Sequence, residues 1–209
     1  NGEKTVVNPH LKWSENGREI CQNWCRELQT QSFRQAGRVN FELRELRQAD
    51  GCTALSLGEA TLTPLKTFLR KEAKKLHQSN LARTFVMAAH GQSKVMAYVT
   101  TLCTQISVEQ FQEQAPIESF KYKDYPAIRL ARLAVDTELQ GQGVGSSLVD
   151  FVIGLAVEHV MPHTGCRFLV VDSKPQSVSF YEKKGFKKIG EAGANGQSTT
   201  TMFIDLHRA

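Results

Sequence analysis

The sequence lacks the long apolar run that a membrane-spanning helix needs. Its longest apolar stretches, such as residues 84–89, are far shorter than the ~20 residues that cross a bilayer. Its start also has no basic segment followed by an apolar one, the pattern typical of a signal peptide. These absences predict a protein with no membrane association and a cytoplasmic location.

Cysteine is scarce, and its spacing is not that of a metal site. The five cysteines form an odd set without a CxxC pair, so neither a disulfide framework nor a zinc site is expected. His159 and His163 lack the HExxH pattern, so no metal is predicted. A nucleophilic Cys166 would need a nearby base, and only His163 lies at loop spacing. We interpret the cysteines as reduced thiols.

Length and charge narrow the class of protein. The chain has 209 residues, 41% of them hydrophobic and 22% charged, which fits one globular domain with an elaboration. Its 26 basic and 21 acidic residues give a net charge of +5, which permits a polyanionic partner without requiring one.

The sequence pattern changes near residue 40, from a polar helical start to alternating strands and helices. Between residues 17 and 37 the apolar residues Ile20, Trp24 and Leu28 recur at helical spacing. This amphipathic helix would pack on the body of the protein or on a sister subunit, or else contact the substrate. We predict an N-terminal helical extension over residues 1–40 and an α/β domain over residues 41–209.

Alternating strand and helix patterns follow the extension. Three helices are expected. The first begins at Thr63, which would cap it before Pro64, and the second begins at Val144. The third follows Ser173, which opens an S-x-x-Q capping pattern. The span from Gln105 to Tyr125 is expected to be irregular or to carry a short helix over the substrate side. The sequence predicts strands at residues 41–46, 84–89, 95–103, 127–135, 168–172 and in the C-terminal TTTMFIDL, with a turn at residues 91–94.

The helix that begins at Thr63 has a basic face. Either this face is only solvated or it contacts phosphates. Its basic residues are Lys66, Arg70, Lys71, Lys74 and Lys75, with His77 and Arg83 just beyond.

A glycine-bearing turn, Gln140-Gly141-Gln142-Gly143-Val144-Gly145, joins the strand at 127–135 to a helix. Glycines let backbone N–H groups converge on an anion, and the helix N-terminus favours a phosphate there. The loop lacks the GK[ST] of nucleotide triphosphatases and the GxGxxG spacing of dinucleotide enzymes. The alternative is a tight strand-to-helix turn without a ligand.

Two motifs in this order resemble the GNAT superfamily of acyl-CoA-dependent N-acetyltransferases. Gln140, Gly143 and Gly145 match its Q/R-x-x-G-x-G/A motif, and residues 180–186, FYEKKGF, match a second signature. The resemblance covers residues 41–209 and implies an α/β fold with a mixed sheet and acetyl-CoA as co-substrate. It implies that acetyl passes directly from the thioester to a bound amine, without a covalent enzyme intermediate.

The resemblance also implies roles for individual residues. Leu133, Ala134 and Val135 would offer backbone hydrogen bonds to the pantetheine arm, and Tyr181 would be the general acid that protonates the leaving thiolate. Lys174 stands where the family often has Asn; it would reach a CoA phosphate or lie exposed. The pyrophosphate would be held by Gln140, Gly141, Gln142, Gly143, Val144, Gly145 and Ser146.

No general base is evident, because the strand at 127–135 carries Arg129 and Arg132 but no carboxylate. An α-amine titrates near ~7.7–8.0 and a lysine side chain near ~10.4, so an α-amine depends less on a general base to remove its proton. This favours aminoacyl-tRNA, a protein N-terminus or a small α-amine as acceptor. A water held by Asp172 or Ser173 would be a relay.

A narrower resemblance is to the GNAT toxins that acetylate aminoacyl-tRNA. It rests on residues 68–87 and on YPAIRLARLAV, whereas Leu57-Gly58 stands where these toxins have Cys-Gly. It implies charged tRNA as acceptor, an antitoxin protein as partner, and phosphate contacts by Lys71, Lys74, Lys75 and Arg83. GNAT-like proteins often form homodimers. The alternatives are acetylation of a protein or small amine, and a non-catalytic acyl-CoA-binding module.

Overall fold

The computed structural model describes residues 41–111, 117, 120–189 and 199–208. The extension predicted over residues 1–40, with its helix at 17–37, lies outside these residues. The division into an extension and a domain therefore stays a prediction. No helix in the described part of the chain is long and apolar enough to cross a membrane.

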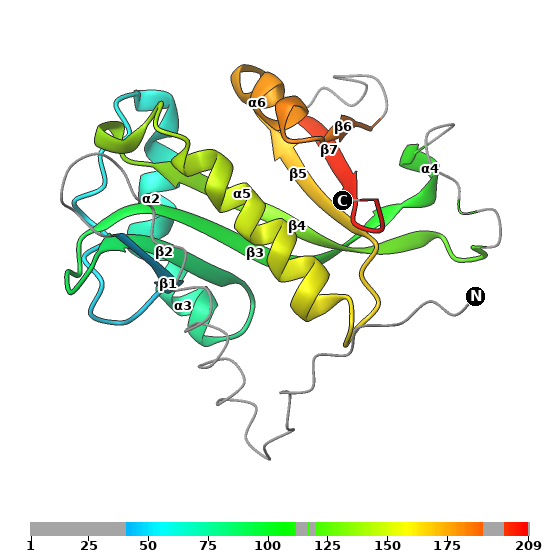
Figure 1. Cartoon of the computed structure of the whole chain (residues 1–209), viewed down its shortest axis with the longest axis horizontal. Helices are drawn as coiled ribbons and strands as arrows, with labels where there is room; N and C mark the ends of the chain where they lie inside the picture. Colours follow the sequence, from blue (N-terminus) through cyan, green and yellow to red (C-terminus); the bar gives the residue numbers. More distant parts are fainter. Residues whose placement is uncertain (1–40, 112–116, 118–119, 190–198, 209) are drawn as a thin grey trace, which may run out of the picture.

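A mixed sheet forms the centre of the described structure, with strand order β1-β2-β3-β4-β5-β7-β6 (Figure 1). Neighbouring strands are antiparallel except β4 and β5, which are parallel. The strands are β1 (Phe41–Glu45), β2 (Arg83–Ala89), β3 (Val95–Ser107), β4 (Asp124–Val135), β5 (Phe168–Ser173), β6 (Lys187–Lys188) and β7 (Thr200–Asp205).

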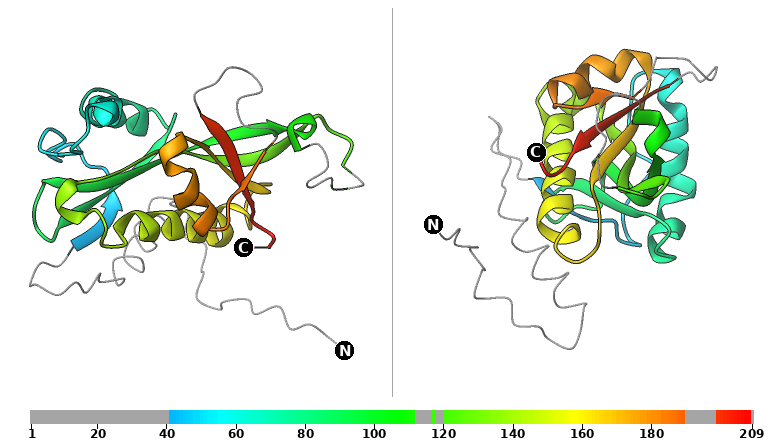
Figure 2. Two further views of the ribbon diagram at one scale, coloured as in Figure 1. Left: turned by 90° about the horizontal axis from the view of Figure 1, so that it is seen from above. Right: turned by 90° about the vertical axis from the view of Figure 1, so that its right-hand side faces the viewer.

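Helices cover both faces of this sheet. Figure 2 shows α5 on one side and α2 and α3 on the other. The α helices are α2 (Thr63–Lys71), α3 (Ala73–Gln78), α4 (Val108–Phe111), α5 (Val144–Leu155) and α6 (Val178–Lys183). Short 3-10 turns lie at Ala60–Leu62, Thr137–Leu139 and Pro175–Ser177, and a π-helical turn at Ala156–Val160 extends α5.

Alternation along the strands divides the core between the two faces. On β3, Val99 faces the α5 side with Leu148 and Val152, whereas Tyr98 faces the α2 side with Leu69. A third cluster, built on Phe111, fills the α2 face at the far end of the sheet. The strands expected from the sequence are therefore confirmed.

Two predicted helix caps are wrong. Thr63 is the first residue of α2 and follows a 3-10 turn, so Leu62 occupies the N-cap position. Ser173 stays in β5 because it pairs with Thr200, and α6 begins only at Val178. The Ser173 hydroxyl donates to the Lys174 carbonyl oxygen, 3.0 Å away, instead of capping a helix.

The expected connection at 105–125 is shorter than predicted. β3 and β4 pair as far as Ser107 and Asp124, because each strand continues to bury residues on the α2 face. Only the residues between these two strands connect them, and α4 lies there as the short helix. Its Phe111 packs on Tyr125 and Phe168, with ring centroids 5.4 Å and 4.8 Å apart.

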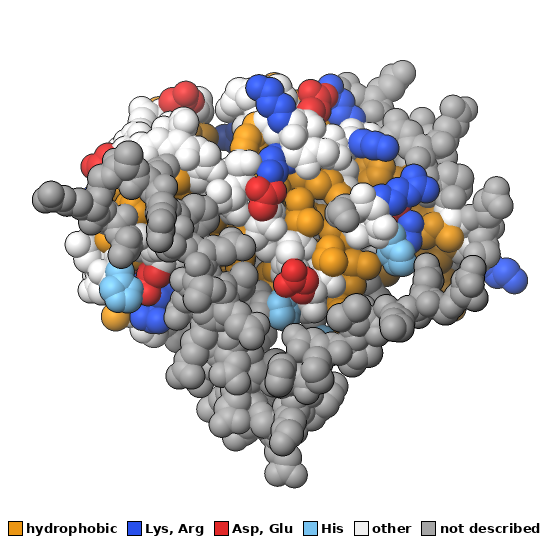
Figure 3. Space-filling view, viewed as in Figure 1, with side chains coloured by type: hydrophobic (Ala, Val, Ile, Leu, Met, Phe, Trp, Pro, Cys, Tyr) orange, Lys and Arg blue, Asp and Glu red, His pale blue; other side chains and the backbone are white. Residues whose placement is uncertain are grey.

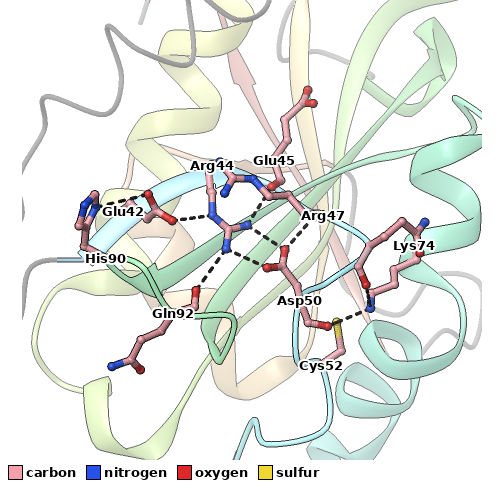
Figure 4. Close-up of polar contacts among 10 residues, drawn as sticks. Glu42, Arg44, Glu45, Arg47, Asp50, Cys52, Lys74, His90 and Gln92 are labelled. Carbon is pink, nitrogen blue, oxygen red and sulfur yellow. Dashed lines mark hydrogen bonds and ion pairs between the residues drawn. The ribbon is translucent and has the colours of Figure 1, made fainter.

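A buried ion pair fixes the loop that follows β1 (Figure 4). Arg44 donates to both carboxylate oxygens of Asp50 at 2.8 Å, and their side chains are 4% and 2% exposed. Arg44 also binds Glu42 at 2.7 Å. Burial opposes ionisation of Asp50, but the hydrogen bonds from Arg44 and from the Arg47 backbone N–H outweigh it and lower its pKa. The loop is thereby tied to the edge strand.

Lys74 of α3 closes the same loop from the other side. Its Nζ donates to the carbonyl oxygens of Gln48 and Asp50, at 2.7 Å and 2.9 Å (Figure 4). This predicted phosphate-binding lysine is thus bound to the protein's own backbone.

Asp50→Ala leaves a buried guanidinium without its main partner, so it should reduce the free energy of unfolding by about 3–5 kcal/mol at pH 7. Because the pKa of Asp50 is lowered on folding, its contribution exists above the unfolded pKa of ~3.9 and fades as the pH falls below that value. Urea unfolding at neutral and acidic pH measures both effects. Glu158→Ala, at a carboxylate with a 70% exposed side chain, is the control and should change stability by less than ~0.5 kcal/mol. Equal effects of the two variants would contradict this account.

Candidate active site

The site begins where two parallel strands part. β4 and β5 pair only through Ala127–Arg129 and Phe168–Val170, and then diverge (Figure 1). β4 continues to Val135 beside β3, so its edge toward β5 has no strand partner over these last residues. Unpaired backbone N–H and C=O groups require other partners, such as a ligand or water. Leu133, Ala134 and Val135 lie in this unpaired stretch.

Two adjoining cavities occupy this gap. The larger, which we call the groove, measures about 700 Å³ and is lined by Leu133–Val135, Tyr181, residues of α2 and the ends of β4 and β5. The smaller, about 500 Å³, lies against the glycine turn and the start of α5. Val135 and Gln140 line both, so the two cavities form one continuous surface.

The glycine turn presents the start of α5 to the smaller cavity. Gly141 and Gly143 have φ of +74° and +82°, a conformation that other residues adopt only with strain. Gly143 is the N-cap of α5 and has no side chain to bind the first N–H groups, so they remain available to an anion. Of the predicted loop residues, all except Gln142 line this cavity.

Two side chains fix the turn. Gln140 donates from Nε2 to the Val135 carbonyl oxygen at 2.9 Å, and Gln142 donates to the Glu138 carbonyl oxygen at 2.7 Å. Asp136 is buried, and its carboxylate accepts from the Ser56 and Glu138 N–H groups at 2.7 Å and 3.1 Å. The sequence analysis missed Asp136, whose only signal was an acidic residue directly after a strand.

Tyr181 enters the groove from α6. Its ring packs on Phe180 and Phe186, with centroids 5.0 Å and 5.3 Å apart. Gly185, with φ of +85°, allows the chain to reverse so that Phe186 reaches this ring. The hydroxyl makes no hydrogen bond within the described ranges. Burial raises the pKa of Tyr181 to about 12, so the phenol remains a proton donor at neutral pH.

Charged side chains border the groove on the α2 face of the sheet. Arg129 forms an ion pair with Asp172, and the Asp172 carboxylate also accepts from Thr201 Oγ1 at 2.9 Å. Lys174 donates from Nζ to the Thr61 carbonyl oxygen at 2.9 Å. Lys174 therefore connects the loop before α6 to the turn before α2.

The predicted basic residues lie apart from the gap between β4 and β5. Lys71 and Lys75 are exposed on α2 and α3. Arg83 is exposed at the start of β2, and its Nη1 lies 4.0 Å from Glu45 and 3.4 Å from His77 Nε2. Of the four predicted residues, Lys74 alone has its ammonium held by backbone carbonyls.

Cys166 has no environment for a nucleophile. It is buried, and burial raises the pKa of its thiol. A second residue that the sequence analysis missed is Lys183, an exposed lysine that lines the smaller cavity beside the glycine turn.

Comparisons with known proteins agree with this geometry. Residues 108–206 match a family described as "Acetyltransferase (GNAT) domain". A tRNA-acetylating toxin of Mycobacterium tuberculosis (strain ATCC 25618 / H37Rv) is 32% identical over 115 residues, which are 55% of this chain. The chain spans 65% of the length of that relative.

Solved structures show the same fold. A tyrosine-to-phenylalanine mutant of KacT superposes with a TM-score of 0.72, and AtaT complexed with acetyl-methionyl-tRNAfMet with 0.70. Each is 20% identical, and the match covers 80% of this chain and 96% of theirs. AtaTR bound with AcCoA gives a TM-score of 0.66 at 20% identity, over 80% of this chain and 95% of that one.

The fold expected from the sequence is thus confirmed. The match to the KacT structure covers 80% of this chain, and the family match begins at α4 and ends after β7. Over residues 108–206 the chain is therefore similar to acetyltransferase domains of the GNAT family.

Proposed function

We propose that the chain is an acetyl-CoA-dependent N-acetyltransferase whose acceptor is the α-amine of an aminoacyl-tRNA. The observation that carries this proposal is the unpaired edge of β4, which opens beside the buried Tyr181 and ends at the glycine turn. An extended amide chain, a leaving thiolate and a pyrophosphate suit these three features in this order.

The two adjoining cavities suit the two ends of acetyl-CoA. Leu133, Ala134 and Val135 would pair with the amides of the pantetheine arm, as a strand would. Free N–H groups at the start of α5 would bind the pyrophosphate, with Lys183 adding a positive charge. The thioester would then lie in the groove near Tyr181.

Tyr181 and the groove would support direct transfer. The amine nitrogen forms a bond to the acetyl carbon while the carbon–sulfur bond breaks, and the departing sulfur receives a proton from the Tyr181 hydroxyl. The proton lost by the amine returns to the phenolate through water. Positioning of the two reactants would supply most of the rate enhancement, and the phenol would contribute as a general acid.

The acceptor is inferred from the chemistry of the groove and from relatives. No carboxylate of β4 faces the groove among the described residues, so an amine of low pKa suits it better than a lysine side chain. The M. tuberculosis relative is a tRNA-acetylating toxin, and AtaT has been solved with acetyl-methionyl-tRNAfMet. Exposed Lys71 and Lys75 would meet the phosphates of such an acceptor.

Labelled acetyl-CoA tests the proposal against its alternatives. Label should move into charged tRNA and not into uncharged tRNA. Transfer only to protein or to small amines would keep the enzyme and discard tRNA as its acceptor. Binding of acetyl-CoA without transfer to any acceptor would favour a non-catalytic acyl-CoA-binding module.

The remaining partners stay predictions. AtaT has been solved with the C-terminus of the antitoxin AtaR, which supports an antitoxin for this chain. Ile153 and Leu155 of α5 pack against the core and are only partly buried. Hydrophobic side chains also gather on the face of the molecule drawn in Figure 3, which supports a homodimer. A cytoplasmic location is likewise untested.

Tyr181→Phe removes the proton donor and keeps the ring packing. It should lower kcat by about 10²–10⁴-fold while the KM for acetyl-CoA changes little. In the parent enzyme, the pH profile should show no loss of activity from ionisation of Tyr181 until the pH approaches 12. Steady-state kinetics across pH measure both, and an undiminished kcat in the variant would contradict the assigned role.

Gly143→Ala forces a side chain into the left-handed region, at a cost of about 1–2 kcal/mol. We expect weaker binding of acetyl-CoA, because the N–H groups of the turn move away from the pyrophosphate. Gly154→Ala is the matched control within α5, since an added Cβ there meets nothing within 4 Å. It should stabilise the fold by about 0.5–1 kcal/mol without changing acetyl-CoA affinity. Calorimetric titration and thermal unfolding distinguish the two; similar affinities would remove the turn from the binding site.

Replacing Lys71 and Lys75 together with Ala should weaken the use of charged tRNA. If both contact phosphates, the slope of log affinity against log salt should fall in magnitude by about 1.4–1.8. Lys74→Ala should lower stability and leave the slope unchanged, because its ammonium binds backbone carbonyls. Salt titrations of tRNA binding measure this, and an unchanged slope in the double variant would show that the basic face is only solvated.

A further inference from the structure

Two arginines of β4 share one face of the sheet because of a β-bulge. Residues three apart in a regular strand point to opposite faces. In β4, however, Arg132 pairs with Thr100 and Leu130 pairs with Thr101, which leaves Ala131 as an extra residue. The bulge shifts the alternation by one position. Arg129 and Arg132 both line the groove as a result.

The two guanidinium groups are held by different elements of the fold. Arg129 is bound to Asp172 on β5, which Thr201 of β7 also contacts. Arg132 lies over the Phe68 ring of α2, with its guanidinium carbon 5.3 Å from the ring centroid. Arg132 Nη1 donates to the Ala131 carbonyl oxygen at 2.8 Å. The extra residue of the bulge therefore also orients the Arg132 side chain.

Both arginines keep donors for a ligand. A guanidinium has five N–H donors, and each arginine uses only Nη1 in its hydrogen bonds to described residues. The Arg129 side chain is 29% exposed, and Arg132 is exposed. Among the described residues Arg132 has no carboxylate within ion-pair distance, so its charge is uncompensated there.

We propose that Arg129 and Arg132 form a phosphate clamp for the last phosphodiester of the acceptor RNA, next to the amine that is acetylated. This inference rests on the proposed function and adds a specific subsite to it. Two forked guanidinium groups match the oxygens of a phosphodiester. They line the same groove as Tyr181 and Leu133, so the bound phosphate would set the depth to which the aminoacyl group enters.

The clamp differs from the other anion-binding features of the protein. The glycine turn serves the smaller cavity, on the other side of Val135. Lys71 and Lys75 lie on the outer helices and would meet more distant phosphates. Of the arginines that the structure describes, only Arg129 and Arg132 combine a held guanidinium with a place in the groove itself.

The test compares an acceptor that has the phosphodiester with one that lacks it. Arg129→Gln and Arg132→Gln are assayed with methionyl-tRNA and with the 3′-methionyl ester of adenosine, which carries no phosphate. Each variant should lower kcat/KM for methionyl-tRNA by about tenfold or more, with no change for the adenosine ester or in the KM for acetyl-CoA. Arg132→Lys should lose part of the effect, because it keeps the charge without the fork.

Arg208→Gln is the matched control. The Arg208 side chain is 80% exposed, and it follows the end of β7, where β7 pairs with the start of β5. This variant should leave both acceptors unaffected. If Arg129→Gln does not fold, Arg132→Gln carries the test, because its side chain is exposed and makes no ion pair with a described residue. Equal losses with both acceptors, or a raised KM for acetyl-CoA, would overturn the clamp. No transfer by the parent enzyme to either acceptor would overturn the proposed function as well.

Discussion

The site depends on the short length of the ladder between β4 and β5. Their parallel ladder covers Ala127–Arg129 and Phe168–Val170 and then stops, while antiparallel partners on the outer sides hold each strand in place. A sheet that remained paired to Val135 would leave no gap. Because the strands part, the edge of β4 that faces the cavity has no strand partner over its last residues, which favours a ligand that itself resembles a strand.

Rigid supports surround this gap. Asp136 ties the end of β4 to the segment before α2 through the Ser56 N–H, and Arg44 with Asp50 anchors the loop after β1. On the opposite side, Gly185 reverses the chain so that Phe186 supports the Tyr181 ring. Buried charges and aromatic packing thus hold the elements that carry the site, which preorganises it for two reactants.

The sequence predicts the elements well because their signals are local. Alternating apolar residues identify β4, and the glycines at 141 and 143 mark a turn whose positive φ the structure confirms. The FYEKKGF segment places Tyr181 on a helix that ends at a glycine. The long-range features could not be predicted: the bulge at Ala131 depends on pairing with β3, and Lys74 binds carbonyls of Gln48 and Asp50 that are distant in sequence. The cap at Ser173 fails for the same reason, since pairing with Thr200 outweighs a local motif.

Hydrogen exchange with and without acetyl-CoA tests the central claim most directly. If the unpaired edge of β4 holds the co-substrate, acetyl-CoA should slow exchange of amides within residues 133–135 and at the start of α5, and leave β1 and β2 unchanged. Saturating acetyl-CoA that protects neither segment, or protects only segments elsewhere in the chain, would contradict the account.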